Sequence, residues 1–309
     1  MHIRNLPYKS LHKPTLRDDV GQVGQSTFDS ALASDRKADI DSPEVLISMP
    51  TEGIFATPRL VSDLNDCYFY HDMDIPEYGH VKGDWDLRGG VRDYLGGVDF
   101  KGKRVLDVGT ASGFLCFYME QQGAEVVGFD LSKDESWDIV PYQRYDYERF
   151  LLDQREKIGR LNNGFWLAHK AFRSSVKMVY GSVYQIPPEI GTVDISVFGS
   201  VLLHLRDPFL ALQNALRLTR ETVIVTEAYR SLSLRGFYRS LRFPLRPWNL
   251  GKTCMGFLPD FKTCEPKETW WQLTPSIIQR FLAVLGFEKT QVQRHTQKKR
   301  TTDTGYSLL

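Results

Sequence analysis

The chain has 309 residues, of which 42% are hydrophobic and 25% are charged. This is ordinary globular usage, and it excludes a fibrous or wholly disordered protein. With 39 basic against 38 acidic residues, the overall charge identifies no partner. No apolar run approaches the roughly 18 residues that span a bilayer, and the first residues lack the apolar core of a secretory signal. We therefore expect a soluble, cytoplasmic protein without a membrane partner.

The four cysteines, Cys67, Cys116, Cys254 and Cys264, contain no Cys-x-x-Cys pair. A chain of this size can build a core without disulfides, so free thiols are the simplest interpretation. Nine residues separate Cys254 from Cys264, a spacing that does not favour a zinc site. We expect no bound metal.

Three stretches differ in character along the chain. Residues 1–60 are polar with little periodicity, and residues 61–100 are rich in aromatic side chains. We interpret residues 1–100 as an N-terminal arm and a cap over the active site. From residue 101 to residue 309 strand patterns alternate with helix patterns, which predicts an α/β domain.

The predicted elements of this domain follow in chain order. Strands are expected at 103–108, 125–129, 176–180, 193–198 and 222–226. A helix over 114–122 ends at Gly123, and further helices begin at Asp207-Pro208 and Thr274-Pro275, where a side-chain cap precedes a proline. Inserts at 131–175 and 229–271 interrupt the alternation, the first with two helices, 150–158 and 165–172. The basic residues 294–300 fit an ordinary surface hairpin.

The strongest local signal is the sequence VLDVGTASG at 105–113, followed by VVGFD at 126–130. A glycine turn directly after a strand brings backbone N–H groups to a ligand at a helix N-terminus. An acid at the end of the second strand, here Asp130, can bind a ribose diol. Nicotinamide, flavin and S-adenosylmethionine sites share this arrangement. Asp107 favours the last, because a carboxylate suits a cationic cofactor better than a pyrophosphate.

On these residues the chain, from about residue 101 onward, resembles the class I S-adenosylmethionine-dependent methyltransferases. The resemblance implies a Rossmann-like, seven-stranded, mostly parallel sheet, with Gly305–Leu309 as an antiparallel last strand. It also implies a cofactor site, in which Gly109, Ala111 and Gly113 wrap the methionine part, Asp130 binds ribose, and Ser182 and Val183 flank adenine. Asp107, Thr110, Leu131 and Ser200 complete that predicted site. The family's central glycine is Ala111 here, which we expect to be tolerated with a negative φ.

Two segments resemble one branch of that family, the bacterial tRNA wobble-uridine carboxymethyltransferases. They are HDMDIPEYGHVKGDWDLRGG at 71–90 and SVLLHLRDPFLAL at 200–212. That branch reads a carboxylated cofactor partly through a tyrosine immediately before the histidine of the second motif. This chain has Leu203 at that position, so ordinary methyl transfer is the better prediction.

Methyl transfer requires mainly that the acceptor be aligned and desolvated, with a general base where the acceptor is a hydroxyl. His204, just past the fourth strand, is the candidate base, and bracing the turn is its alternative role. Glu227, at the end of the fifth strand, is a second catalytic candidate, and a structural hydrogen bond is its alternative. His71 and Trp85, upstream of the first strand, are candidate substrate contacts in the roof of the site.

Residues 229–262 carry seven basic residues against one acid. Arg235 and Arg239 belong to a run at helical spacing, and aromatic residues interleave with it. Contact with phosphates and stacked bases would need this combination, whereas a solvated face or a homodimer contact would also accommodate it.

Three functions therefore stay open. The first is O-methylation of a small-molecule acceptor, favoured by the aromatic cap and the aromatic insert, which fit an enclosed pocket. The second is tRNA modification through the basic segment. The third is a binding module that holds the cofactor without turnover, because fold alone does not separate these functions.

Overall fold

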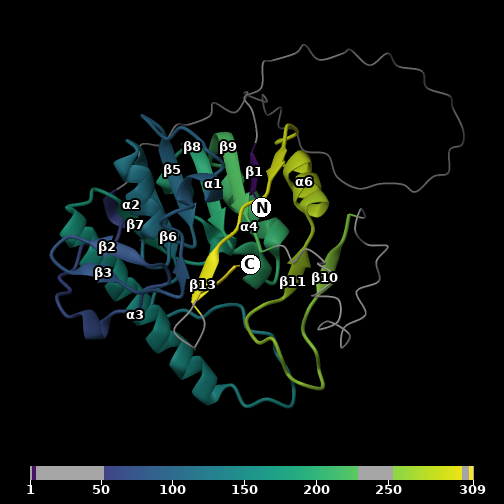
Figure 1. Cartoon of the computed structure of the whole chain (residues 1–309). Helices are drawn as coiled ribbons and strands as arrows, with labels where there is room; N and C mark the ends of the chain where they lie inside the picture. Colours follow the sequence, from purple (N-terminus) through teal and green to yellow (C-terminus); the bar gives the residue numbers. More distant parts are fainter. Residues whose placement is uncertain (1, 5–51, 229–252, 301–305, 309) are drawn as a thin grey trace, which may run out of the picture.

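The computed structural model of the chain describes residues 2–4, 52–228, 253–300 and 306–308 (Figure 1). Five parallel strands form the centre of its main sheet. In spatial order they are β7 (Lys177–Tyr180), β6 (Glu125–Asp130), β5 (Arg104–Val108), β8 (Val193–Gly199) and β9 (Thr219–Thr226). Beyond β9, β1 (His2–Arg4) and β12 (Gln291–Gln293) extend the sheet in antiparallel register. The predicted α/β fold with a mostly parallel sheet is confirmed.

Caps, prolines and glycines in the sequence predicted the bounds of most helices and strands of this domain to within a residue or two. Helix α2 (Phe114–Gln121) ends before Gly123, whose φ of +90° is the left-handed geometry that a helix stop requires. Helices α4 (Pro208–Leu216) and α6 (Pro275–Val284) begin at the two predicted proline sites. Their caps Asp207 and Thr274 accept hydrogen bonds from Leu210 N–H and Ile277 N–H. Both satisfy a backbone donor that the first helical turn leaves open.

Two predictions of secondary structure are wrong. The expected helices 150–158 and 165–172 are one helix, α3 (Glu148–Phe172), because its polar middle makes tertiary contacts. Asn162 Nδ2 donates to Leu131 O at 3.2 Å. The expected last strand of the main sheet, Gly305–Leu309, is also wrong: β14 (Tyr306–Leu308) pairs with β13 (Lys298–Arg300) in a separate sheet. The pairing of β13 with β14 confirms the hairpin expected at the basic tail.

Two apolar clusters cover the faces of the main sheet. On one face, Val105, Val126 and Ile195 pack against α2 and the second half of α3. On the other face, Leu106, Phe129 and Phe198 pack against α4 and α6. Alternate residues of the same strands therefore serve opposite faces, as strands buried on both sides require.

The segment before the sheet joins the α2 side of the core. It comprises η1 (Glu52–Ile54), η2 (Leu64–Asp66), β2 (Met73–Ile75), β3 (Gly79–Val81), β4 (Trp85–Asp86) and α1 (Val91–Tyr94). Met73, Ile75 and Leu87 are buried in the same cluster as α2, and Thr226 Oγ1 donates to Tyr94 O at 2.8 Å. This segment is thus packed onto the sheet, and its service as a cap stays a prediction. The first part of the predicted arm, residues 5–51, lies outside the described residues.

Short elements complete the fold around the carboxyl ends of the strands. They are η3 (Val183–Gln185), η4 (Pro188–Ile190), η5 (Leu202–His204) and the hairpin of β10 (Met255–Phe257) with β11 (Trp271–Leu273). Strand β13 also pairs with β4, so the C-terminal hairpin lies beside the segment that carries Trp85. All four cysteines are free thiols, as expected.

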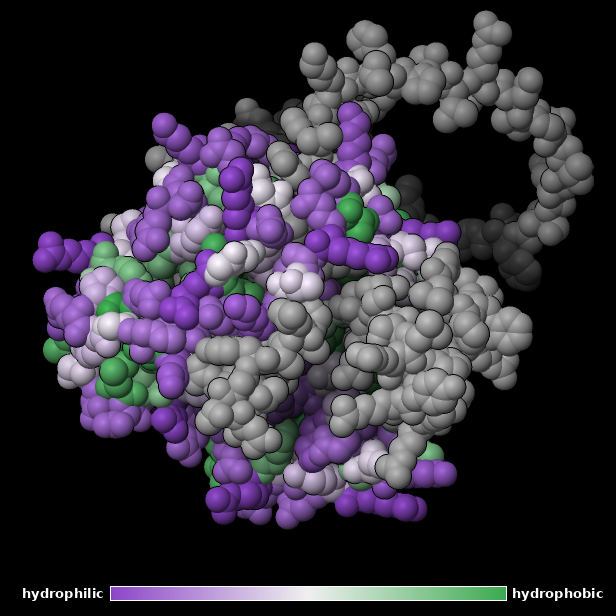
Figure 2. All heavy atoms as spheres, viewed as in Figure 1, coloured by the Kyte–Doolittle hydropathy of each residue, from purple (hydrophilic) through white to green (hydrophobic). Residues whose placement is uncertain are grey.

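The face in Figure 2 is mostly hydrophilic, with hydrophobic side chains exposed in small groups. Among the described helices, none combines the length and the apolar character that crossing a bilayer requires.

Candidate active site

The carboxyl ends of the parallel strands bring the predicted residues to one edge of the sheet. Asp107 lies near the end of β5, Asp130 ends β6, Ser182 and Val183 follow β7, and Ser200 and Glu227 follow β8 and β9. In sheets of this topology this edge is where ligands bind.

The glycine turn after β5 is built from left-handed residues. Gly109 has φ +79°, Ala111 φ +51° and Gly113 φ +90°. The negative φ expected at Ala111 is wrong. The turn holds Ala111 in this strained conformation because its N–H donates to Asp130 Oδ2 at 2.5 Å. Thr110 ties the same turn to the neighbouring strand, since its hydroxyl donates to Asp107 O and accepts from Phe129 N–H, both at 3.0 Å.

Gly113→Ala is expected to lower the free energy of unfolding by about 2–4 kcal/mol, the sum of backbone strain and overpacking. A Cβ at Gly113 would lie 2.5 Å from Phe117 Cε2 and 2.8 Å from Phe165 Cδ2. Urea denaturation measures the change. The matched control is Gly286→Ala, where φ is +92° but no atom lies within 4 Å of the added Cβ. Equal losses in the two variants would show that the aromatic contact contributes nothing.

Asp130 and Asp107 are the two acids of this edge. Each Asp130 oxygen accepts one backbone N–H, from Ala111 and from Leu131 (2.7 Å), and burial raises the pKa of its carboxyl to about 6. Asp107 is 1% exposed, and its Oδ2 accepts from the Cys116 thiol at 3.1 Å. Its Oδ1 has no hydrogen-bond partner in the part of the chain that the structure describes, and burial followed by the charge of Asp130 raises its pKa to about 7. A buried carboxyl with an open oxygen is a site for a cationic group.

The residues after β7 and β8 shape the same edge. Ser182 caps η3 by accepting from Tyr184 N–H at 3.3 Å, and Val183 is buried behind it. Ser200 has φ +59°, and its N–H donates to Thr226 O at 2.7 Å. The unusual backbone at Ser200 turns the chain sharply from β8 toward η5, where His204 lies.

His204 is held by an insert, not by its own loop. Its Nδ1 lies 2.5 Å from the backbone oxygen of Glu268. A carbonyl only accepts, so Nδ1 carries the proton and Nε2 keeps its lone pair. Nε2 makes no hydrogen bond to a described residue. Burial lowers the pKa of the imidazole, which therefore stays neutral at neutral pH.

Glu227 is 4% exposed and braces the histidine turn, because its Oε1 accepts from Leu202 N–H at 2.7 Å. Its Oε2 has no hydrogen-bond partner among the described residues. Burial raises the pKa of the carboxyl to about 8, so the group is largely protonated at neutral pH. The structural hydrogen bond considered for Glu227 is thus present, and one oxygen remains open to a ligand.

The segment 68–94, the predicted roof of the site, contacts the glycine turn. Tyr70 N–H donates to Ser112 Oγ at 3.2 Å, which anchors the roof to the glycine turn. The His71 ring lies 5.4 Å from that of Phe114, and burial lowers the pKa of His71 to about 4. His71 Nδ1 is buried and makes no hydrogen bond to any residue that the structure describes. The backbones of His71 and Trp85 pair in an isolated parallel β-bridge within this segment.

The sequence interpretation missed a second group of residues beside His204. Gln154 and Lys157 lie one helical turn apart on α3. Gln154 Nε2 donates to Glu268 Oε1, and the Lys157 charge adds to burial in lowering the pKa of His204. Trp270 N–H donates to Leu203 O at 2.9 Å, which docks the segment 266–270 on the histidine turn. No motif marks these side chains, because the two inserts meet only in the folded chain. Arg235 and Arg239 lie outside the described residues.

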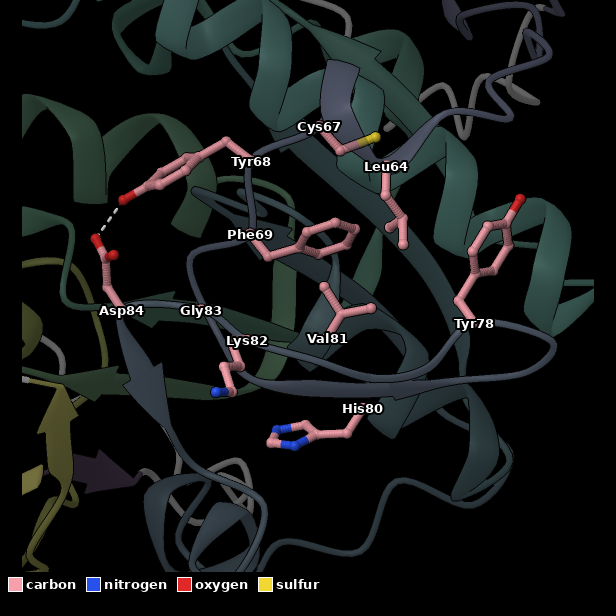
Figure 3. Close-up of a pocket in the computed structure, with 10 residues that line it drawn as sticks. All are labelled: Leu64, Cys67, Tyr68, Phe69, Tyr78, His80, Val81, Lys82, Gly83 and Asp84. Carbon is pink, nitrogen blue, oxygen red and sulfur yellow. Dashed lines mark hydrogen bonds between the residues drawn. The ribbon is translucent and has the colours of Figure 1, made fainter. Parts of the chain in front are cut away.

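A separate cavity of about 410 Å³ lies in the N-terminal segment, between η2 and β3 (Figure 3). Leu64, Phe69 and Val81 line its apolar part. In Figure 3 the side chains of Tyr68 and Asp84, which share a hydrogen bond, point toward each other and away from those apolar residues. Lys157 Nζ lies 5.0 Å from the centre of the Tyr68 ring. Tyr68 and Asp84 thus form a polar part of the cavity wall, and the Lys157 contact joins that wall to α3.

Comparison with known families decides the class. The model of a methyltransferase domain matches residues 86–247, just over half of the chain. The chain belongs to this methyltransferase family. It is an S-adenosylmethionine-dependent methyltransferase, and the predicted enzyme class and cofactor are confirmed. The tRNA-modifying branch is not shown.

Solved methyltransferases resemble this one distantly. The magnesium protoporphyrin IX methyltransferase of Synechocystis PCC 6803, with bound S-adenosylhomocysteine, is 16% identical, with 72% of this chain and 78% of that chain covered and a TM-score of 0.41. The 1,6-didemethyltoxoflavin-N1-methyltransferase of Burkholderia thailandensis is 15% identical, with 71% of each chain covered and a TM-score of 0.36. No curated protein matches the sequence significantly. At this distance the solved structures carry no argument about the acceptor.

Proposed function

We propose that this methyltransferase methylates an oxygen of a small-molecule acceptor, with His204 as the general base. The observation that carries the proposal is the Nδ1 contact of His204 with Glu268 O at 2.5 Å. It leaves Nε2 as the basic atom, on the turn that follows β8. A neutral imidazole with a free Nε2 can take the proton of a hydroxyl as the oxygen is methylated.

The cofactor supplies an electrophilic methyl group on a cationic sulfonium. The carboxyl of Asp107, with its open Oδ1, suits the ammonium of the methionine part. Asp130 suits the ribose, because each carboxylate oxygen has a second lone pair beyond the one that accepts a backbone N–H. We place Gly109, Thr110, Ala111, Gly113, Leu131, Ser182, Val183 and Ser200 around the rest of the cofactor.

Calorimetric titration of the full chain with S-adenosylmethionine and S-adenosylhomocysteine, with and without bulk tRNA, tests this function. We expect S-adenosylmethionine to bind with a micromolar Kd that added tRNA does not change. We also expect methyl transfer to small hydroxylated compounds. Binding sharpened by tRNA, with salt-dependent association, would favour the tRNA alternative through the basic segment 229–262. Cofactor binding without turnover on any acceptor would favour a binding module.

Cofactor binding is expected to release protons near pH 6.5. Asp107 has a pKa of about 7 without a cation nearby, and an ammonium beside it favours the ionised carboxylate. Affinity should therefore rise with pH up to about pH 8. Calorimetry at pH 6.5 in buffers of different ionisation enthalpy measures the released protons. Asp107→Asn should abolish the release assigned to this group, and unchanged release in that variant would place the titrating group elsewhere.

A further inference from the structure

Asp107 and Cys116 form a buried pair between β5 and α2. Side chains alternate along a strand, so Asp107 faces the same side of the sheet as Val105, which packs in the apolar cluster with α2. Cys116 lies in the first turn of α2, and helix side chains tilt toward the N-terminus, here toward the end of β5. Cys116 Sγ lies 3.1 Å from Asp107 Oδ2, and the two residues are 0% and 1% exposed.

The thiol is the donor of this hydrogen bond when the carboxyl is ionised. Burial, followed by the charge of Asp107, raises the pKa of the Cys116 thiol, so the sulfur keeps its proton. A second acceptor, Thr110 Oγ1, lies farther from the sulfur, at 3.8 Å. The single thiol proton therefore binds Oδ2. Asp107 Oδ1 makes no hydrogen bond to a described residue and is the oxygen open to a ligand.

The other groups around Asp107 do not replace the thiol. Its neighbours in register, Gly128 on β6 and Val197 on β8, are not ionisable. Asp130 at the end of β6 raises the pKa of Asp107. The hydroxyl of Tyr94 on α1 stays neutral, because burial and then nearby acids, Asp107 among them, raise its pKa. The Cys116 hydrogen bond is the largest influence that lowers the Asp107 pKa against burial, ahead of the Thr110 hydroxyl.

We propose that Cys116 is a positioning residue for the cofactor: its thiol holds Oδ2 of Asp107 and thereby presents Oδ1, as part of an ionised carboxylate, to the ammonium of the methionine part. This inference rests on the proposed function, because it takes Asp107 as the partner of that ammonium. A thiol is a weak donor, so Asp107 is only partly ionised near neutral pH and becomes fully ionised when the cation binds. Cys116 thus sets the pH range in which the protein binds its cofactor.

Cys116→Ala, which removes the donor, is expected to raise the pKa of Asp107 by about one unit, because the ionised carboxylate loses a hydrogen bond. Cys116→Ser keeps a donor and should hold the pKa at or below its value in the unsubstituted protein. Carbon-13 NMR of the full chain, labelled at the aspartate carboxyl carbons, measures this pKa without any ligand. Asp107→Asn identifies the resonance.

Calorimetry with S-adenosylhomocysteine measures the consequence for binding. Only the ionised carboxylate attracts the ammonium, so Cys116→Ala should raise Kd about tenfold at about pH 6 and much less at about pH 9, where Asp107 is ionised in both proteins. Cys116→Ser should bind as the unsubstituted protein does. The matched control is Cys67→Ala, which removes another buried thiol, one that donates to Asp63 O at 3.4 Å. It should change neither the pKa of Asp107 nor the Kd.

Lost packing alone would weaken binding equally at both pH values and leave the pKa of Asp107 in place, and that result would overturn the inference. If the pKa does not move while Asp107→Asn still weakens binding, the role of Cys116 is wrong and the proposed function stands. If the pKa moves but neither Cys116→Ala nor Asp107→Asn changes the Kd, Asp107 does not bind the ammonium. The inference and the cofactor assignment of the proposed function then fail together.

Discussion

His204→Asn is expected to lower kcat by at least about 100-fold, the usual contribution of a general base, while the affinity for S-adenosylmethionine stays within about twofold. Asparagine keeps a polar side chain near Glu268 O but offers no basic nitrogen. Steady-state kinetics and calorimetry separate the two effects. The control is His169→Asn. His169 is a half-buried histidine on α3, away from the site, and its Nε2 forms a hydrogen bond with Val176 O. Loss of cofactor affinity with intact kcat would instead assign His204 the bracing role.

The same assignment fixes the sign of the pH dependence. The base works in its neutral form, and burial holds the pKa of His204 below its usual value. With S-adenosylmethionine saturating, kcat/KM for the acceptor should therefore fall only on the acidic side of about pH 6.5. An acidic limb centred above pH 7 would contradict a histidine in this environment.

Asp130→Ala is expected to weaken cofactor binding by about 1–3 kcal/mol, which is roughly 5- to 150-fold in Kd. The variant removes the proposed acceptor for the ribose hydroxyls. It also frees the N–H of Ala111, which the carboxylate holds at φ +51°. Calorimetry with S-adenosylhomocysteine measures the change. Glu125→Gln, at the exposed opposite end of β6, should leave Kd unaltered. Unchanged affinity in Asp130→Ala would remove Asp130 from the ribose site.

Apolar runs, caps and glycine turns predicted the parallel core because they act over few residues. The run at 103–108 became β5, and the Asp-Pro and Thr-Pro pairs began α4 and α6. The same kind of signal misled at Asn162–Gly164, where polar residues and a glycine read as a break between helices. Tertiary packing explains that glycine: a Cβ at Gly164 would lie 2.7 Å from Tyr68 O. The residue is small because the roof segment crosses α3 there.

The candidate site likewise has one part that local sequence signals predict and another that only tertiary packing determines. Asp107 and Asp130 lie at the ends of strands and the glycine turn follows one directly. The sequence by itself therefore determined the fold class, the cofactor class and the edge where the residues lie. Only the tertiary structure decided which atom of His204 is basic and which residues surround it. Glu268 comes from one insert and Gln154 and Lys157 from another. Glu268 lies 114 positions from Gln154 and 64 from His204, and no local pattern links residues so far apart. Their contacts arise when long segments pack over the sheet, an outcome of the whole fold and not of its local propensities.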